Sequence, residues 1–205
     1  MSALNDLCQV ILTCQKCPTL VESRTKVVPG DGAEEARIMF IGEAPGFHED
    51  QQGKPFVGPA GMFLNQLISS IGLRREQVYI TNVIKCRPPN NRDPLPVEVH
   101  NCQHWLDSQI ELINPKMIVA LGRYSMTRFF PGKSISKIHG TAYKQGDIIY
   151  FAMYHPAAAL HQQSLRQQIE ADMLKIPSLL AESETVQETT PPPKQLNMFE
   201  AQENE

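Results

Sequence analysis

The sequence lacks several features that define large classes of protein. It contains no run of eighteen apolar residues, so we expect no membrane-spanning helix. Residues 1–6 also lack the basic patch and apolar stretch that mark a secretory signal. We therefore expect an intracellular, cytoplasmic protein, a setting in which structural disulfides are rare.

A strong positive charge is also missing, since 19 basic residues stand against 22 acidic ones. The acidic excess lies after residue 180, where six glutamates accompany one lysine. Without that segment 18 basic and 16 acidic residues remain, so the rest of the chain carries about +2. This balance permits nucleic-acid binding without demonstrating it.

The length of 205 residues suits one domain with a substantial core. Residues 181–205 are rich in Glu, Thr, Pro and Gln and contain too few apolar side chains to order themselves. We therefore expect a monomer with a folded domain over residues 1–180 and a disordered acidic tail over residues 181–205.

Apolar periodicity within residues 1–180 alternates between helix and strand. The predicted elements are helix 4–13, strand 37–42, loop 42–58, a helix from Pro59, strand 78–85, helix 97–113, strand 117–122, a short helix before Pro131, a hairpin turn at 145–147, strand 148–154 and helix 158–180. This alternation predicts a three-layer α/β/α sandwich with a mostly parallel sheet. Ligands of such sheets bind beyond the carboxyl ends of the strands.

Five cysteines are present, and an odd number indicates a ligand set plus a spare thiol. Cys8 lies on the apolar stripe of the first helix and is expected to be a buried structural thiol. Cys14 and Cys17 form a C-x2-C pair, and Cys86 and Cys102 bracket a proline-rich loop. Four thiolates can hold zinc or a [4Fe–4S] cluster, and unrelated thiols also remain possible.

Chemistry-bearing residues follow the predicted strands. Phe56 could stack on a flat ring, and Asn82 could read a hydrogen-bonding edge with its amide donor and acceptor. His155 could donate to an oxygen on which negative charge builds, and Glu43 or Glu49 could hold a water or stabilise a cation. Each also has an ordinary structural reading, as a core ring, a satisfied amide, a structural imidazole or solvated carboxylates.

The motifs together resemble the family 4 uracil-DNA glycosylases over residues 4–180. The resemblance rests on Cys14-x2-Cys17, Gly42-Glu-Ala-Pro-Gly46, Gly53-Lys-Pro-Phe-Val-Gly58, Thr81-Asn-Val-Ile-Lys-Cys-Arg-Pro-Pro-Asn-Asn91, Cys102 and His155-Pro156. It implies a uracil-DNA glycosylase-like fold and a [4Fe–4S] cluster on Cys14, Cys17, Cys86 and Cys102. It also implies a DNA-repair enzyme that flips uracil out of DNA and hydrolyses its N-glycosidic bond.

The resemblance assigns expected roles to individual residues. Phe56 would stack on uracil, Asn82 would read its edge, His155 would support the departing anion, and Glu43 or Glu49 would orient the water. The remaining expected contacts are backbone groups of Gly42, Ala44 and Gly46 around uracil, and DNA contacts from Arg87, Asn90, Arg92 and Leu160. The alternative is a non-catalytic iron–sulfur module of the same fold that only binds nucleic acid.

Two departures from the family pattern stand out. Ala44 replaces a glycine, which is harmless only if the backbone angle φ there is negative. The run Ala157-Ala-Ala-Leu160 leaves only Leu160 to wedge into a duplex. No arginine-rich insertion precedes Cys102, so we expect turnover and no covalent trapping of the product.

The tail contains Gln195-Leu-Asn-Met-Phe199, which resembles the pentapeptide that binds the bacterial sliding clamp. Gln195 would set the register, and Leu196, Met198 and Phe199 would fill an apolar groove. On this resemblance we expect a bacterial protein that acts near the nucleoid.

Overall fold

A six-stranded sheet forms the middle layer of the computed structural model, which describes residues 2–188. The strands are β1 (Asp31–Gly32), β2 (Ile38–Gly42), β3 (Tyr79–Asn82), β4 (Met117–Leu121), β5 (Ala142–Gln145) and β6 (Ile148–Met153). Their order is β1-β3-β2-β4-β6-β5. The four central strands are parallel, and the edge strands β1 and β5 are antiparallel to their neighbours.

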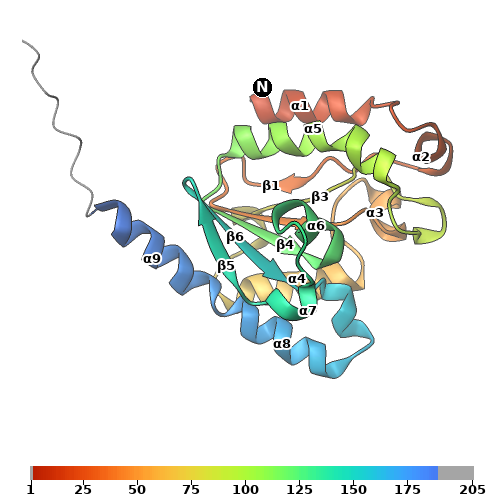
Figure 1. The fold of residues 1–205 in the computed structure, drawn as a ribbon. Coiled ribbons are helices and arrows are strands. Elements are labelled where there is room, and N and C mark those ends of the chain that lie inside the picture. The colour runs from red at the N-terminus through yellow and green to blue at the C-terminus, as the bar shows by residue number, and fades with distance from the viewer. Residues whose placement is uncertain (1, 189–205) are drawn as a thin grey trace, which may run out of the picture.

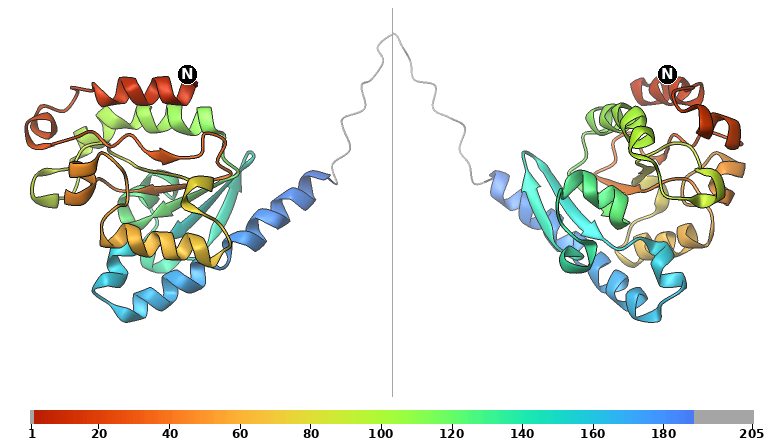
Figure 2. Two further views of the ribbon diagram at one scale, coloured as in Figure 1. Left: turned by 180° about the vertical axis from the view of Figure 1, so that it is seen from behind. Right: turned by 45° about the vertical axis from the view of Figure 1, so that its right-hand side comes forward.

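Helices cover both faces of the sheet (Figures 1 and 2). The α-helices are α1 (Ala3–Leu12), α2 (Pro18–Ser23), α3 (Phe47–Gln52), α4 (Pro59–Ser70), α5 (Pro96–Ile113), α6 (Gly122–Phe129), α7 (Ile135–Ile138), α8 (Gln163–Met173) and α9 (Ile176–Glu188). Three short 3-10 helices are η1 (Arg75–Gln77), η2 (Pro89–Asn91) and η3 (Pro156–Leu160). Helices α1 and α5 lie on one face, and α4 and α8 lie on the other.

The strands alternate between two hydrophobic cores because successive side chains of a strand point to opposite faces. Met39 and Ile41 of β2 pack with residues of α1 and α5. Ile38 and Phe40 of the same strand pack with residues of α4 and α8. The predicted three-layer α/β/α sandwich with a mostly parallel sheet is therefore confirmed.

Three predicted segments differ from the structure. The strand predicted over residues 78–85 leaves the sheet after Asn82, where Val83 and Ile84 donate hydrogen bonds to carbonyls of the residues 42–43 segment. The loop predicted over residues 42–58 contains α3, which Gly46 begins and Gly53 ends with a left-handed φ of 74°. The helix predicted over residues 158–180 is divided into η3, α8 and α9.

Helix α9 continues to Glu188, so the first residues of the predicted disordered tail are helical. Residues 181–188 contain Ala, Glu and Gln and no proline or glycine, which favours helix. Residues 189–205, with the clamp-binding-like motif, lie outside the described residues.

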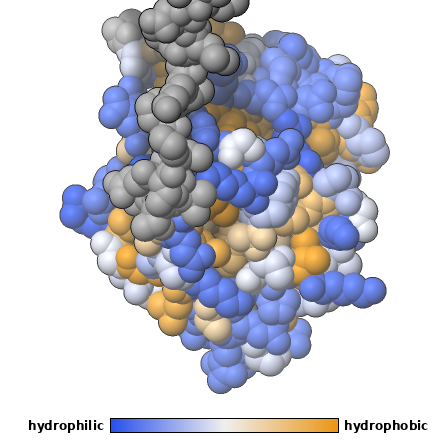
Figure 3. All heavy atoms as spheres, turned by 60° about the vertical axis from the view of Figure 1, so that its left-hand side comes forward, coloured by the Kyte–Doolittle hydropathy of each residue, from blue (hydrophilic) through white to orange (hydrophobic). Residues whose placement is uncertain are grey.

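The described residues contain no helix long and apolar enough to cross a membrane. On the face drawn in Figure 3, hydrophilic side chains lie between smaller apolar groups. The predicted cytoplasmic location stays a prediction.

Candidate active site

A pocket of about 340 Å³ opens where β2 and β3 end and where the chain leaves β6. Most of the predicted uracil-binding and catalytic residues line it, namely Glu43, Ala44, Gly46, Glu49, Phe56, Asn82 and His155. These residues come from three separate segments of the chain, and the parallel sheet brings them together because its carboxyl ends meet at one edge.

Gly42 is a predicted site residue that does not line the pocket but packs against two residues that do. A Cβ at this position would lie 2.4 Å from Asn82 Oδ1 and 2.7 Å from the Phe56 ring. Any side chain at Gly42 would therefore displace both residues. Ala44 is not among the described residues with positive φ, so its backbone tolerates a side chain.

Asn82 ends β3 and is 2% exposed. Among the described residues its Oδ1 atom has no hydrogen-bond partner, although the atom is buried. Its main-chain carbonyl, by contrast, accepts a hydrogen bond of 2.8 Å from Lys85 Nζ. A buried acceptor without a partner costs free energy, so its presence beside a pocket indicates a ligand that donates to it.

His155 follows β6, and its imidazole is held as the neutral form. Burial lowers the pKa of His155 to about 4, although Glu49 opposes this shift. Its Nδ1 atom accepts a hydrogen bond of 3.1 Å from the Ala157 amide, so the ring proton resides on Nε2. The arrangement makes Nε2–H a donor for a ligand oxygen.

Gly122 supports His155 and was not identified from the sequence as a site residue. Its φ is +83°, and a Cβ there would lie 2.9 Å from the Cβ of His155. The only sequence signal was that a glycine ends the strand predicted over residues 117–122.

Phe56 adopts a backbone φ of 52°, which non-glycine residues rarely occupy. Arg75 stabilises this turn by donating to the carbonyl oxygens of Pro55 and Phe56. The ring is 5% exposed and stacks against His155 with 5.4 Å between ring centroids. Phe56 thus belongs to the core and also presents part of its ring to the pocket.

The two candidate carboxylates have different environments. Glu49 accepts hydrogen bonds from the amides of Gly46, Val57 and Gly58 at 3.1, 2.9 and 2.9 Å. Its carboxylate therefore holds the 46–58 loop in shape. Within residues 2–188 no hydrogen bond or ion pair engages the Glu43 carboxylate, and burial, helped by Asp93, raises the pKa of Glu43 to about 7.

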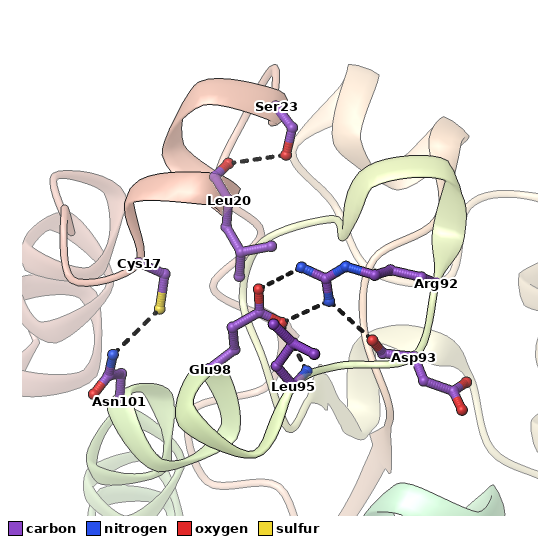
Figure 4. Close-up of polar contacts among 8 residues, drawn as sticks. All are labelled: Cys17, Leu20, Ser23, Arg92, Asp93, Leu95, Glu98 and Asn101. Carbon is purple, nitrogen blue, oxygen red and sulfur yellow. Dashed lines mark hydrogen bonds and ion pairs between the residues drawn. The ribbon is translucent and has the colours of Figure 1, made fainter.

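The residues predicted to contact DNA also differ in their environments. Arg92 donates to both carboxylate oxygens of Glu98, at 2.9 and 2.6 Å, and Glu98 also accepts from the Leu95 amide (Figure 4). Arg92 thus holds the loop before α5 and also lines the pocket, and its expected contact with phosphate stays a prediction. Arg87 and Asn90 lie on the adjoining segment, and Leu160 is 46% exposed but does not line the pocket.

Four of the five cysteines line one small hollow between α2, the end of the β3 segment and α5, namely Cys14, Cys17, Cys86 and Cys102. Arg24 donates to Cys86 Sγ at 3.0 Å, and Asn101 Nδ2 lies 3.8 Å from Cys17 Sγ (Figure 4). Cys8 is elsewhere, half-buried on α1 with its sulfur 3.8 Å from the Tyr79 hydroxyl. The structure therefore brings the predicted ligand set together and separates the spare thiol.

Comparison with known proteins adds a second kind of observation. The model of the "Uracil DNA glycosylase superfamily" matches residues 29–175. A type-4 uracil-DNA glycosylase of Sulfurisphaera tokodaii is 49% identical over 189 residues, covering 87% of this chain and 86% of the relative. One from Archaeoglobus fulgidus is 47% identical, covering 87% and 94%, and one from Thermotoga maritima is 46% identical, covering 82% and 89%.

Proposed function

The chain belongs to the uracil DNA glycosylase superfamily and to its type-4 enzymes, and on this premise we propose how its pocket performs uracil excision. The protein is a uracil-DNA glycosylase, a DNA-repair hydrolase that acts on uracil-containing DNA. The reaction breaks the bond between uracil N1 and deoxyribose C1′ after the base leaves the stack.

Uracil recognition falls to Asn82. The unpartnered Oδ1 accepts the N3–H of uracil, and Nδ2 donates to O4. Cytosine carries an acceptor at N3 and an amino group at C4, so it would face both amide groups with the wrong polarity. The buried, unpaired oxygen of Asn82 is the observation that carries this proposal.

Bond cleavage leaves negative charge on the uracil ring. The neutral imidazole of His155 donates from Nε2 to O2, where that charge accumulates, and Phe56 packs against the ring. Gly42, Ala44 and Gly46 bring backbone close to the base.

Glu43 orients the attacking water, because backbone amides already occupy the Glu49 carboxylate. A carboxyl group with a pKa of about 7 ionises near neutral pH and can accept a proton from the attacking water. The same charge faces the positive charge that develops on the sugar.

The test of the recognition step is Asn82→Asp. We expect uracil release from an oligonucleotide to fall by about a hundredfold, since the donor to O4 is lost. Asn5→Asp on α1 is the matched control and should retain activity. Alkaline cleavage of the abasic product measures both variants. An Asn82→Asp protein with wild-type rate and selectivity would contradict the pocket.

The four cysteines fit a [4Fe–4S] cluster, which when bound would tie α2 and α5 to the loop beside the pocket. In zinc sites the thiolates surround one ion at about 2.3 Å. Cys14, Cys17, Cys86 and Cys102 all line one hollow, and four thiolates are the ligand set that a [4Fe–4S] cluster takes. Burial raises the pKa of Cys102 to about 11, so binding must displace its proton.

The cluster proposal is tested by the metal and sulfide content of the purified protein and its visible absorption. Cys102→Ser should lose iron and the broad absorption, and Cys8→Ser should keep both. Stoichiometric zinc in the wild-type protein would contradict the proposal.

The tail motif Gln195–Phe199 carries the proposal of sliding-clamp binding, which rests on the sequence alone. A peptide of residues 190–205 should bind the clamp, and the same peptide with Leu196, Met198 and Phe199 replaced by alanine should not.

Light scattering of the full chain tests the expected monomer.

A further inference from the structure

An exposed phenylalanine stands beside the uracil pocket and has no role in the mechanism above. Phe47 is the first residue of α3 and directly follows Gly46, which lines the pocket. Its side chain is 53% exposed. Single exposed apolar residues are common on proteins, so exposure alone does not indicate a function.

The ring of Phe47 is held by polar neighbours. The Arg87 guanidinium lies over the ring with its Cζ 5.2 Å from the centroid. Arg87 Nε in turn donates to Asn91 Oδ1 at 2.7 Å, and Asn91 lines the pocket. His48 meets the ring edge-on, with 5.6 Å between centroids. The aromatic surface is therefore held next to two residues of the pocket lining, Gly46 through the chain and Asn91 through Arg87.

The segment after His155 offers little to replace an extruded base. Its only residue in the pocket lining beyond His155 is Ala157, whose methyl side chain is too small to stack on a base. Extrusion of a base removes its stacking on both neighbours, at a cost of a few kcal/mol. A side chain near the pocket must restore part of that stacking if duplex DNA is to be opened efficiently.

We propose that Phe47 is a substrate-contact residue that stacks on the base next to the extruded uracil, with Arg87 beneath it. The inference rests on the pocket proposed above and adds a contact outside it. Aromatic stacking tolerates any base, which suits an enzyme that meets uracil in every sequence context. Arg87 supports the ring through a cation–π contact. It also brings positive charge toward the phosphates, in line with the DNA contact predicted for it from the sequence.

The experiment combines Phe47→Ala with removal of the neighbouring base. Single-turnover and steady-state uracil release are measured on duplexes with a normal base, or a tetrahydrofuran abasic unit, directly 5′ or 3′ of the uracil. Phe47→Trp tests rescue by another aromatic ring. Met62→Ala is the matched control, since Met62 is 59% exposed on α4 and does not line the pocket.

We expect Phe47→Ala to lower kcat/KM on the normal duplex by about tenfold, within the range of base–aromatic stacking. Phe47→Trp should restore the rate. On the duplex that lacks the stacked neighbour, wild type and Phe47→Ala should differ by less than about twofold, because the partner of the ring is gone. Met62→Ala should match wild type on every duplex.

Two results would overturn the inference. One is an unchanged rate for Phe47→Ala on the normal duplex. The other is an equal loss on all duplexes, which would assign Phe47 to loop structure. Either result leaves the pocket intact, because Asn82→Asp tests the pocket separately. An inactive Asn82→Asp beside an unaffected Phe47→Ala would remove this contact alone.

Discussion

The uracil pocket and the loop before α5 both contain a glutamate and other polar side chains, but these groups serve opposite purposes. In the pocket, Asn82 Oδ1 is buried without a partner and the Glu43 carboxylate is unengaged within the described residues. In the loop, Glu98 is bound by Arg92 and by the Leu95 amide. Paired groups hold structure, whereas unpaired groups in a cavity are kept for a ligand. The two regions differ in whether their polar groups have hydrogen-bond partners, and residue type alone does not reveal this.

Substitutions of Glu43 and Glu49 test most directly whether unpaired groups serve the reaction and paired groups serve stability. Glu43→Gln should lower kcat by about a hundredfold or more, since it removes the proposed general base, while the fold persists. Glu49→Gln should mainly lower Tm, because an amide cannot accept the same backbone donors equally well. Uracil release and thermal unfolding of both variants measure this. A Glu49→Gln protein with native stability and no activity would reverse the assignment.

The pH dependence should follow Glu43. Because its pKa is about 7, we expect kcat/KM to fall by about fiftyfold between pH 7 and pH 5 as the carboxylate gains its proton. His155, with a pKa of about 4, stays neutral over this range. Rates measured from pH 5 to pH 9 test this, and a flat profile would contradict the role of Glu43.

Stability should respond to the same group with the opposite sign. The folded pKa of Glu43 is raised, so its stabilising contribution is present below the usual pKa of 4.5 and is lost as pH rises to about 7. Glu43→Gln should therefore unfold at a higher Tm than wild type at pH 8 and at a similar Tm at pH 4.

Gly122→Ala tests how closely the backbone holds His155. A methyl group would meet His155 Cβ at 2.9 Å, and the φ of +83° disfavours any side chain. Displacement of the imidazole should lower kcat by about tenfold with a smaller change in KM. Gly132→Ala is the matched control, because Gly132 also has positive φ but no atom within 4 Å of an added Cβ.

The smallest effect is expected where two arginines of one segment are compared. Arg92→Ala should lower Tm by about 5 °C, since the buried carboxylate of Glu98 loses its partner. Arg87→Ala should leave Tm nearly unchanged and reduce the salt dependence of DNA binding by about one phosphate contact. Thermal scans and binding measured at several salt concentrations separate the two roles.

Sequence patterns predicted the order of elements well where long apolar repeats exist. The parallel strands β2 and β4 and the helices α1, α4 and α5 lie close to their predicted bounds. Helix α3 was missed because side-chain capping by Glu49 and a left-handed Gly53 create it within a loop of weak periodicity. Such short elements depend on particular hydrogen bonds, which periodicity does not reveal.

By itself the sequence determined the alternating fold, the family resemblance and the residue types available for chemistry, because these follow from apolar spacing and motifs along the chain. Only the tertiary structure decided which groups remain free. It engages Glu49 and Arg92, leaves Asn82 Oδ1 without a partner among residues 2–188, and sets the proton of His155 on Nε2. These outcomes depend on contacts between segments far apart in the chain, where burial and hydrogen-bond partners are established together.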